Sequence, residues 1–544
     1  MKIYSAEVWY TYASFMGKHV EDLHTIAQRL LAERLSTCVM HQDGTTYWNS
    51  HNGVHSGVTT VDPHNQTGDN LHLKLHDGEN PPAGWALDAW SILAAMRWNE
   101  LRLFGADRPM PAPYIRTFLG ECSFGSLTTP TFIGRPIITL YETGVILFQL
   151  RGNEMPEQPD AETFVNRYVN LASKRFSEIW VHPAYARLAT RAWHHLEHPG
   201  QNFRQRLTTS RLDREHDIAV RQSSLVDHTS DEPTPKVLLP SSADEQLDTL
   251  QTFADLVFHI IAFIVGPPRS GWRYVLRGQS QIPEVGRFWT GRPHIYLYRF
   301  DDQCDTPAEN EEKHRRLFGG IIARALHESA DMSKLLPKNL RLLPDYGLYI
   351  AQSAILVAYS NSGFPDAASN EPTPSEGDIL GHVVTFQMLE YGYMLHRSLA
   401  ESAGELNDVR AVYETQQELA RLKVTMSEVS HYGEIIGVLE EGWESFRVNA
   451  LMNWTSESLA ATSALTSLRD TRITERASQV LSVLFGMIAV PPIASDVILP
   501  LWKLFGWPMP KDPDSASLMM VGIAFVLVAV VLIGMLRFVA RAEE

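Results

Sequence analysis

The chain has 544 residues with ordinary hydrophobic (44%) and charged (20%) fractions, so it is long enough for two or three domains with hydrophobic cores. Its formal net charge of −16 disfavours a nucleic-acid partner, because no basic stripe is available to neutralise phosphates. The three cysteines, Cys38, Cys122 and Cys304, show no paired spacing, which is typical of a reducing compartment and argues against a disulfide framework or a zinc knuckle.

The first part of the chain has the patterns of a mixed α/β domain. Residues 2–10 have the composition of a strand, and residues 20–35 and 85–104 have helical patterns. Residues 136–151 predict a β-hairpin, with a Glu-Thr-Gly turn between two runs of β-branched and aromatic residues. The polar, proline-bearing stretch 228–246 predicts a linker.

A second α/β part follows this linker. Residues 247–265 predict a helix that Gly-Pro-Pro stops, and residues 273–277 and 294–300 predict strands. An acidic loop at 301–312 and a helical section to about residue 359 are expected to close this part.

The long stretch after Pro374 contains no proline until Pro491, which predicts long helices with a break near Gly404. Apolar residues recur there at heptad spacing, in a pattern that is coiled-coil-like. The helices either pack on their own domain or associate with a second copy of the chain.

Two apolar segments then indicate an integral membrane protein. Residues 516–536 carry no charge and, at 1.5 Å per residue, form a helix of about 32 Å, enough to cross a hydrocarbon layer of about 30 Å. Residues 477–495 are also uncharged, and the apolar character continues to residue 504. The predicted parts are a cytosolic mixed α/β domain (1–230), a second α/β cytosolic part (240–365), a helical stalk (378–476), a first transmembrane helix (477–504), an outer loop (505–515), a second transmembrane helix (516–536) and a cytosolic tail (537–544).

The distribution of cations predicts the orientation in the membrane. More cations flank the two spans than lie between them, so both termini are expected on the cytoplasmic side of the cell (inner) membrane, in a multi-pass topology. Residues 1–7 meet a charge before an apolar signal segment can form, so the N-terminal part is expected to be cytosolic. The flanking cations are Arg469, Arg472, Arg476, Arg537 and Arg541, and those between the spans are Lys503 and Lys511.

One face of the first span carries small or polar residues. They recur at intervals of three to four residues or twice that, so they share a helical face. Two interpretations fit the stripe and do not exclude each other: it lines a water-filled pore, with Asp496 near one mouth, and its small residues let helices approach closely. The predicted pore-lining residues are Ser478, Ser482, Gly486, Ala489 and Asp496.

This arrangement resembles the CorA-like family of two-span metal-ion transporters. Residues 472–482 resemble the family's stalk-to-membrane junction, and Pro491 falls where the family's first span often has a proline. The outer-loop signature Tyr-Gly-Met-Asn of the family is replaced here by Phe505-Gly506-Trp507-Pro508, so this chain lacks the amide that would contact a hydrated ion.

The resemblance implies a fold and a function. The fold is an α+β cytosolic region, long stalk helices and two C-terminal transmembrane helices. The assembly is a homo-oligomer, a pentamer in the family, whose first spans line a pore for a divalent cation such as Mg²⁺ or Zn²⁺. The resemblance also implies a cytosolic basic ring after the second span, for which the tail offers Arg537 and Arg541.

Histidines form two further groups. His194 and His198 are four residues apart, so on a helix they share a face and could hold one metal ion. The alternative is that they are ordinary polar residues near a helix end. A second group lies in a polar, glycine-containing stretch, either as transition-metal ligands or as surface-loop histidines. Its members are His41, His51, His55, His64, His72 and His76.

No pattern in the sequence indicates a catalytic centre, so the chain is not expected to be an enzyme. Two functions remain. The first is an oligomeric channel or transporter for cations, gated by its cytosolic domain. The second is a membrane-anchored sensor or effector, whose cytosolic domain binds a signal molecule or partner, with non-selective or no ion conduction.

Overall fold

The structure, a computed structural model, divides the chain into two compact units. We call Met1–Ser402 with Gln417–Thr455 the α/β unit, and Ala403–Gln416 with Ser456–Glu544 the C-terminal unit. The structure describes residues 1–17, 19–20, 22–50, 53–61, 73–76, 81–105, 112–125, 132–152, 158–197, 237–239, 248–266, 285–286, 291–326, 330–363, 376–403, 409–430 and 432–542.

The α/β unit is built on an 11-stranded sheet with the strand order β14-β15-β13-β1-β10-β9-β6-β2-β3-β4-β5. Its pairs are antiparallel except β13 with β15, which run parallel. The strands are β1 (Ile3–Phe15), β2 (Ser36–His41), β3 (Thr45–Ser50), β4 (Gly53–Val61), β5 (Leu73–His76), β6 (Tyr114–Leu119), β9 (Ile137–Tyr141), β10 (Val145–Arg151), β13 (Arg292–Phe300), β14 (Tyr346–Ile350) and β15 (Ile355–Tyr359).

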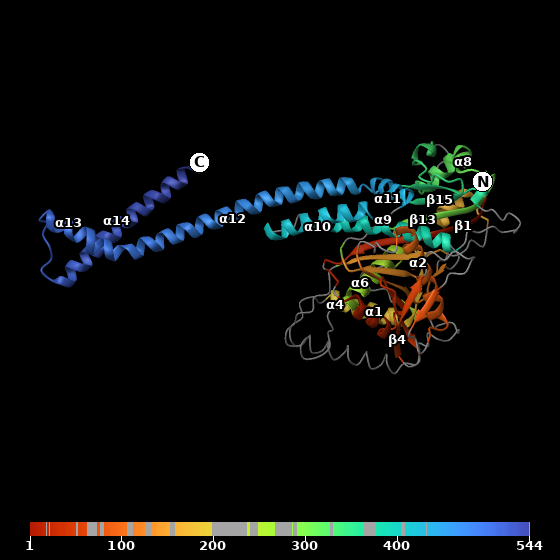
Figure 1. The fold of residues 1–544 in the computed structure, drawn as a ribbon, viewed down its shortest axis with the longest axis horizontal. Coiled ribbons are helices and arrows are strands. Elements are labelled where there is room, and N and C mark those ends of the chain that lie inside the picture. The colour runs from red at the N-terminus through yellow and green to blue at the C-terminus, as the bar shows by residue number, and fades with distance from the viewer. Residues whose placement is uncertain are drawn as a thin grey trace. The chain divides into compact units, whose positions relative to one another are not determined.

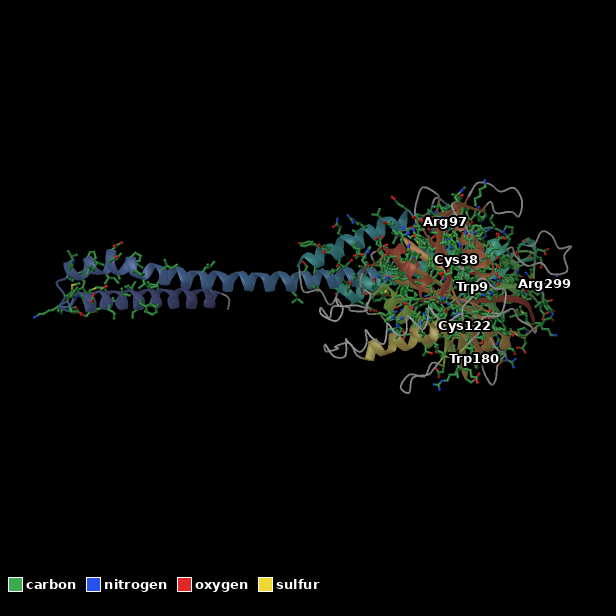
Figure 2. All side chains as sticks on the ribbon, turned by 90° about the horizontal axis from the view of Figure 1, so that it is seen from below. Trp9, Cys38, Arg97, Cys122, Trp180 and Arg299 are labelled. Carbon is green, nitrogen blue, oxygen red and sulfur yellow. The ribbon has the colours of Figure 1, made fainter. Side chains whose placement is uncertain are left out.

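The long strand β1 lies inside the sheet and contributes to a hydrophobic core on each face. Because successive side chains of a strand point to opposite faces, Tyr10 and Tyr12 enter one core while Trp9 and Ala13 enter the other. The buried residues Cys38 and Cys122 (Figure 2) divide between the same two cores, and the three cysteines of the chain form no disulfide bond.

Helices cover both faces of the sheet, which gives three layers (Figure 1). The core with Tyr10 includes α1 (Leu23–Ala32), α3 (Ala161–Arg167), η1 (Val169–Ser173), α4 (Pro183–Glu197), α6 (Leu250–Val265) and α8 (Pro307–Ile322), and η2 (Met332–Leu335) follows α8. The core with Trp9 includes α2 (Trp85–Phe104), α9 (Glu376–Ala403), the second half of α10 (Val409–Ser427) and α11 (Gly433–Ser445).

A smaller four-stranded sheet has the order β12-β11-β7-β8. Phe124, Phe132 and Ile179 of this sheet join the core that contains Tyr10, so the small sheet packs against the same helices. Its strands are β7 (Cys122–Gly125), β8 (Phe132–Gly134), β11 (Glu178–Val181) and β12 (Val237–Leu238).

Local sequence signals account for several elements. The predicted hairpin at 136–151 is confirmed as β9 and β10, whose turn places Gly144 at a φ of 88°. The helix predicted at 247–265 is α6, which starts at a capping box made by Thr249 and Thr252. The acidic loop predicted at 301–312 is wrong from Pro307 onward, where α8 begins. The helical section predicted to residue 359 is confirmed as far as Ile322, the end of α8, but is wrong at its end, which contains β14 and β15. The β-branched and aromatic residues of these two strands pack between strand and helix neighbours, as strand residues do.

The stretches 1–230 and 240–365 contribute strands to one sheet, since β1 pairs with both β10 and β13. The predicted stalk, 378–476, contains α9, α10, α11 and most of α12 (Val448–Pro492). The break expected near residue 404 agrees with the end of α9 at Ala403. α9 is buried in the core of the α/β unit.

In the C-terminal unit, the predicted first span is helical throughout its length. It comprises the end of α12, the π-helix η4 (Ile493–Ile498) and α13 (Leu499–Leu504). The second predicted span lies inside α14 (Pro513–Ala542). Pro491, Pro492 and Pro500 lack backbone N–H groups, which accounts for the departure from regular α-helix between them.

Candidate functional site

The two apolar C-terminal segments pack against each other as a helical hairpin. Val490, Ala494 and Ile498 of the first segment form a buried cluster with Met520 and Ala524 of α14. Alanines on both helices let the backbones approach closely, as in membrane-helix pairs.

Many large apolar side chains among the described residues of the hairpin point outward. In a water-soluble helical hairpin this outer surface would be polar, whereas lipid-facing helices are apolar on the outside. Among the described residues, only the segment Pro513–Val531 of α14 has the length and apolar composition needed to cross a membrane, with a mean hydropathy of 2.2. The exposed apolar residues are Ile488, Val497, Leu501, Leu504, Leu518, Val521, Phe525, Val526, Leu527, Val530 and Val531.

The predicted pore-lining residues lie on these helices. Ser478, Ser482, Gly486 and Ala489 are on α12, but their side chains lie outside the described part of the structure. Asp496 is in the π-helix η4, is exposed, and accepts a hydrogen bond from Ser495 Oγ at 2.8 Å. The pore therefore stays a prediction.

The outer-loop residues form a small aromatic cluster. The rings of Phe505 and Trp507 stack with centroids 5.4 Å apart, and Trp502 meets Trp507 edge-on at 4.6 Å. Trp502 Nε1 donates a hydrogen bond to the carbonyl oxygen of Pro508, and Gly506 has a φ of 62°. Tryptophans gathered beside an apolar helix are typical of the membrane–water interface.

The remaining predicted site residues are placed only in part. Arg537 and Arg541 lie on α14 and His194 lies on α4, but their side chains are outside the described part, as is the whole of His198. Three members of the second histidine group are in strands and not in loops, namely His41, His55 and His76. His51, His64 and His72 are outside the described residues.

A buried row of polar side chains, which we call the polar seam, crosses the sheet beneath α9. At one end, Arg116 on β6 forms a salt bridge with Glu100 of α2 at 2.5 Å and donates a hydrogen bond to Gln387 of α9 at 2.6 Å. Gln387 in turn donates to Gln149 on β10, whose strand partner is Thr11 on β1. These groups satisfy one another inside an otherwise apolar interface.

The other end of the polar seam is a buried ion pair between Arg292 on β13 and Glu390 on α9, both fully buried. Burial alone would raise the pKa of Glu390, but the Arg292 guanidinium and His294 outweigh it and lower that pKa. Burial lowers the pKa of His294, whose Nε2 lies 3.7 Å from Glu390. The Arg292 guanidinium also lies 3.4 Å from the centre of the Phe446 ring.

Sequence reasoning missed the polar seam because its members are far apart in the chain and belong to residue types that are usually exposed. One signal was available. Gln387 and Glu390 interrupt the apolar face of a helix whose neighbours Val383, Val384 and Phe386 are buried. A polar residue on such a face predicts a buried partner.

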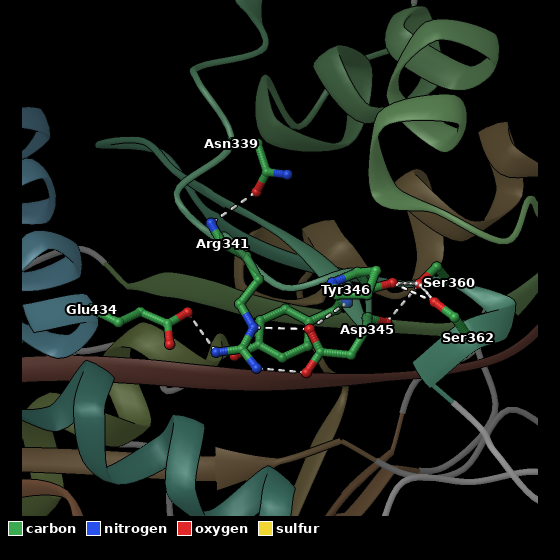
Figure 3. A network of polar contacts seen from close by, with 8 residues as sticks. Asn339, Arg341, Asp345, Tyr346, Ser360, Ser362 and Glu434 are labelled. Carbon is green, nitrogen blue, oxygen red and sulfur yellow. Dashed lines mark hydrogen bonds and ion pairs between the residues drawn. The ribbon is translucent and has the colours of Figure 1, made fainter. Parts of the chain in front are cut away.

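A second network ties the sheet edge to α11 (Figure 3). Arg341 makes two hydrogen bonds to the carboxylate of Asp345, at 2.9 and 2.5 Å, and a third to Glu434 of α11. Its guanidinium also lies 4.4 Å from the centre of the Tyr346 ring. The bidentate pair with Asp345 fixes the loop before β14, and the bond to Glu434 ties this loop to α11.

His382 lies next to this network and makes the stability of the α/β unit depend on pH. It is partly buried against the rings of Tyr296, Tyr346 and Phe386. Burial, with a smaller effect of Arg341, lowers its pKa to about 4. Below the ordinary histidine pKa of about 6.5, His382 binds a proton in the unfolded chain but stays neutral in the folded chain until the pH approaches its lowered pKa.

We therefore expect the His382 contribution to the free energy of unfolding to be complete above pH 6.5 and to fall by about 3 kcal/mol as the pH drops to about 4. Urea unfolding of the detergent-solubilised chain at several pH values measures this change. The variant His382→Gln should have a shallower dependence on pH, and equal slopes for the two proteins would contradict the prediction.

A small pocket lies between α2, the end of β6 and the segment before α4. It has a volume of about 60 Å³ and is lined by Trp85, Glu121, Arg135 and His182, among others. The Arg135 guanidinium lies 3.4 Å from the centre of the Trp85 ring. Pockets for drug-sized ligands span about 300–1,000 Å³, so this pocket suits a much smaller molecule.

Comparison of the chain with protein-family models, with curated proteins and with solved structures finds no match. The resemblance to CorA-like transporters stays a prediction based on the order of the apolar segments and the residues around them.

Proposed function

We propose that this protein is a membrane-anchored sensor or effector. Its C-terminal helical hairpin lies in the bilayer, and its α/β unit binds a signal on the cytosolic side. The observation that carries the proposal is the apolar outer surface of the hairpin, on which side chains such as Leu518, Val526 and Val530 are more than half exposed.

The flanking charges support the orientation. Arg537 and Arg541 follow the second span and Arg476 precedes the first, while Lys503 and Lys511 between the spans are offset by nearby aspartates. Cytoplasmic flanks carry the excess of Lys and Arg. Both ends of the hairpin, and with them the α/β unit, are therefore on the cytoplasmic side.

Alkaline extraction of membranes from cells that express the full chain tests this proposal. We expect the chain to stay in the membrane pellet, and tags at its two ends to be digested by protease only in inside-out vesicles. Release of the wild-type chain into the supernatant, or tags in opposite compartments, would contradict the proposal.

A second candidate function is cation conduction by a homo-oligomer. It is favoured by the position of Asp496, an exposed carboxylate in the π-helix of a predicted span. π-helical turns are frequent at functional sites, and an ionisable residue in a membrane span is usually functional. Two spans of one copy cannot enclose a pore, so this function requires several copies, five in the family that the chain resembles.

Flux measurements in liposomes test conduction. If Asp496 attracts cations to a pore mouth, we expect Asp496→Asn to lower cation flux severalfold, because the ring of negative charge is lost. Asp514→Asn is the matched control, since Asp514 lies in the first turn of α14. Comparison of the fluxes of Mg²⁺, Zn²⁺ and Ni²⁺ with that of K⁺ reports the selectivity of the pore. Equal flux through the Asp496→Asn and Asp514→Asn variants would rule out a role for Asp496.

A further inference from the structure

Three metal-ligating side chains meet at one end of strand β2. His24 lies in the first turn of α1, His41 is the last residue of β2, and Asp43 lies in the turn to β3. One ligand atom from each residue lies within 4.8 Å of the other two. None of the three belongs to the polar seam or to the hairpin, so the proposed function leaves them unused.

Local structure holds each ligand in place. Asp22 caps α1 by accepting a hydrogen bond from the backbone N–H of Thr25 at 3.0 Å, which fixes the turn that carries His24. The backbone N–H of Thr45 donates to Asp43 Oδ1 at 2.7 Å, and Gly44 supplies the φ of 95° that the turn needs.

The three ligand atoms are spaced closely enough to reach one metal ion. His24 Nε2 lies 3.8 Å from Asp43 Oδ2, and His41 Nδ1 lies 2.9 Å from Asp43 Oδ1. Two ligands of a tetrahedral zinc ion are about 3.4 Å apart, so small side-chain rotations would close the set on one ion. The two imidazole rings lie close together, with centroids 4.1 Å apart.

A neighbouring tyrosine orients one of the ligands. His24 Nδ1 is 2.9 Å from the hydroxyl group of Tyr47 on β3, which leaves His24 Nε2 directed toward Asp43. Metal-bound histidines generally use their second ring nitrogen in such a hydrogen bond, and this bond sets the tautomer that binds the ion. Tyr47 therefore acts as a positioning residue.

We propose that His24, His41 and Asp43 bind one divalent transition-metal ion, with zinc as the representative ion. Two imidazoles and one carboxylate form a ligand set that suits Zn²⁺ and related ions but not Mg²⁺. The side chains of His24 and Asp43 are 43% and 50% exposed, so solvent can reach the ion and complete its coordination. The role of this ion as the signal of a membrane-anchored sensor rests on the proposed function. The existence of the metal site does not depend on that function.

Calorimetric titration of zinc chloride into the chelator-treated full chain in detergent tests the site. Asp43→Asn and His41→Gln should each weaken the binding of one zinc ion per chain by at least ~10-fold, and Tyr47→Phe by about 10- to 100-fold. Asp43→Asn keeps an acceptor for Thr45, so the turn should still form. The controls His55→Gln and His76→Gln, on β4 and β5, should leave this binding unchanged.

A second readout is the midpoint of thermal unfolding, which zinc should raise for the wild-type chain but not for Asp43→Asn. The proposal is overturned if the wild-type chain binds no zinc. It is also overturned if all the variants bind zinc equally. Because the titration is performed in detergent, its outcome is independent of whether the hairpin inserts into membranes.

Discussion

Replacing both Val526 and Val530 with Asp should release the protein from the membrane. The two valines lie four residues apart near the middle of the second predicted span, and they are 61% and 64% exposed on the surface of the hairpin. An aspartate at the centre of a transmembrane helix costs about 2.5–3.5 kcal/mol, so the pair should cost about 5–7 kcal/mol of insertion free energy. The measurement is the fraction of chain that stays in the pellet after alkaline extraction.

The matched control is Leu342→Asp with Leu343→Asp in the α/β unit, where both leucines are exposed and no membrane contact is expected. This control should fractionate like the wild-type chain. If the Val526 and Val530 variant also stays in the pellet, α14 is not in contact with lipid, and the hairpin binds membranes indirectly or not at all.

Replacing Glu390 with Ala should destabilise the α/β unit by about 3–5 kcal/mol, because it leaves the Arg292 guanidinium buried without its carboxylate. The control is Glu401→Ala on the same helix. Glu401 pairs with Arg397 at 3.1 Å but is 40% exposed, so its loss should cost less than about 1 kcal/mol. Urea unfolding in detergent, followed by tryptophan fluorescence, measures both changes.

The double variant Arg292→Met, Glu390→Met separates the cost of an unpaired charge from the value of the ion pair. Apolar side chains of similar size often replace a buried ion pair without loss, so this protein should recover most of the stability that Glu390→Ala loses. If Glu390→Ala costs no more than Glu401→Ala, water reaches Arg292 and the ion pair is not buried in solution.

Elements with local signals could be predicted from the sequence. The hairpin β9–β10 follows from alternating β-branched residues around Gly144, and the two apolar C-terminal segments follow from composition alone. The pairing of β1 with β13 could not be predicted, because it joins residues almost 300 positions apart and no local pattern specifies the partner. Strands β14 and β15 were assigned to a helical section because short apolar runs do not distinguish buried strands from helices.

The candidate sites could be predicted less well. His41 was recognised as a ligand candidate, but His24 and Asp43 were not, because they come from different elements that meet only in the fold. The histidine pair His194 and His198, chosen for helical spacing, lies partly outside the described residues. Asp496 was found because a charge inside an apolar segment is conspicuous, whereas Glu390, in a mixed helix, is not.

The position of β1 inside the large sheet affects how the protein is made. One edge of β1 pairs with β10, and the other edge pairs with β13, which begins at Arg292. The second edge therefore stays unpaired until β13 has been synthesised. At about 5–20 residues per second, a ribosome needs about 15–60 s to add the residues between β1 and β13. During that time a 13-residue strand exposes an unpaired edge, which is a site for aggregation. Newly made chains are therefore expected to depend on chaperones that shield this edge until Phe300 has emerged.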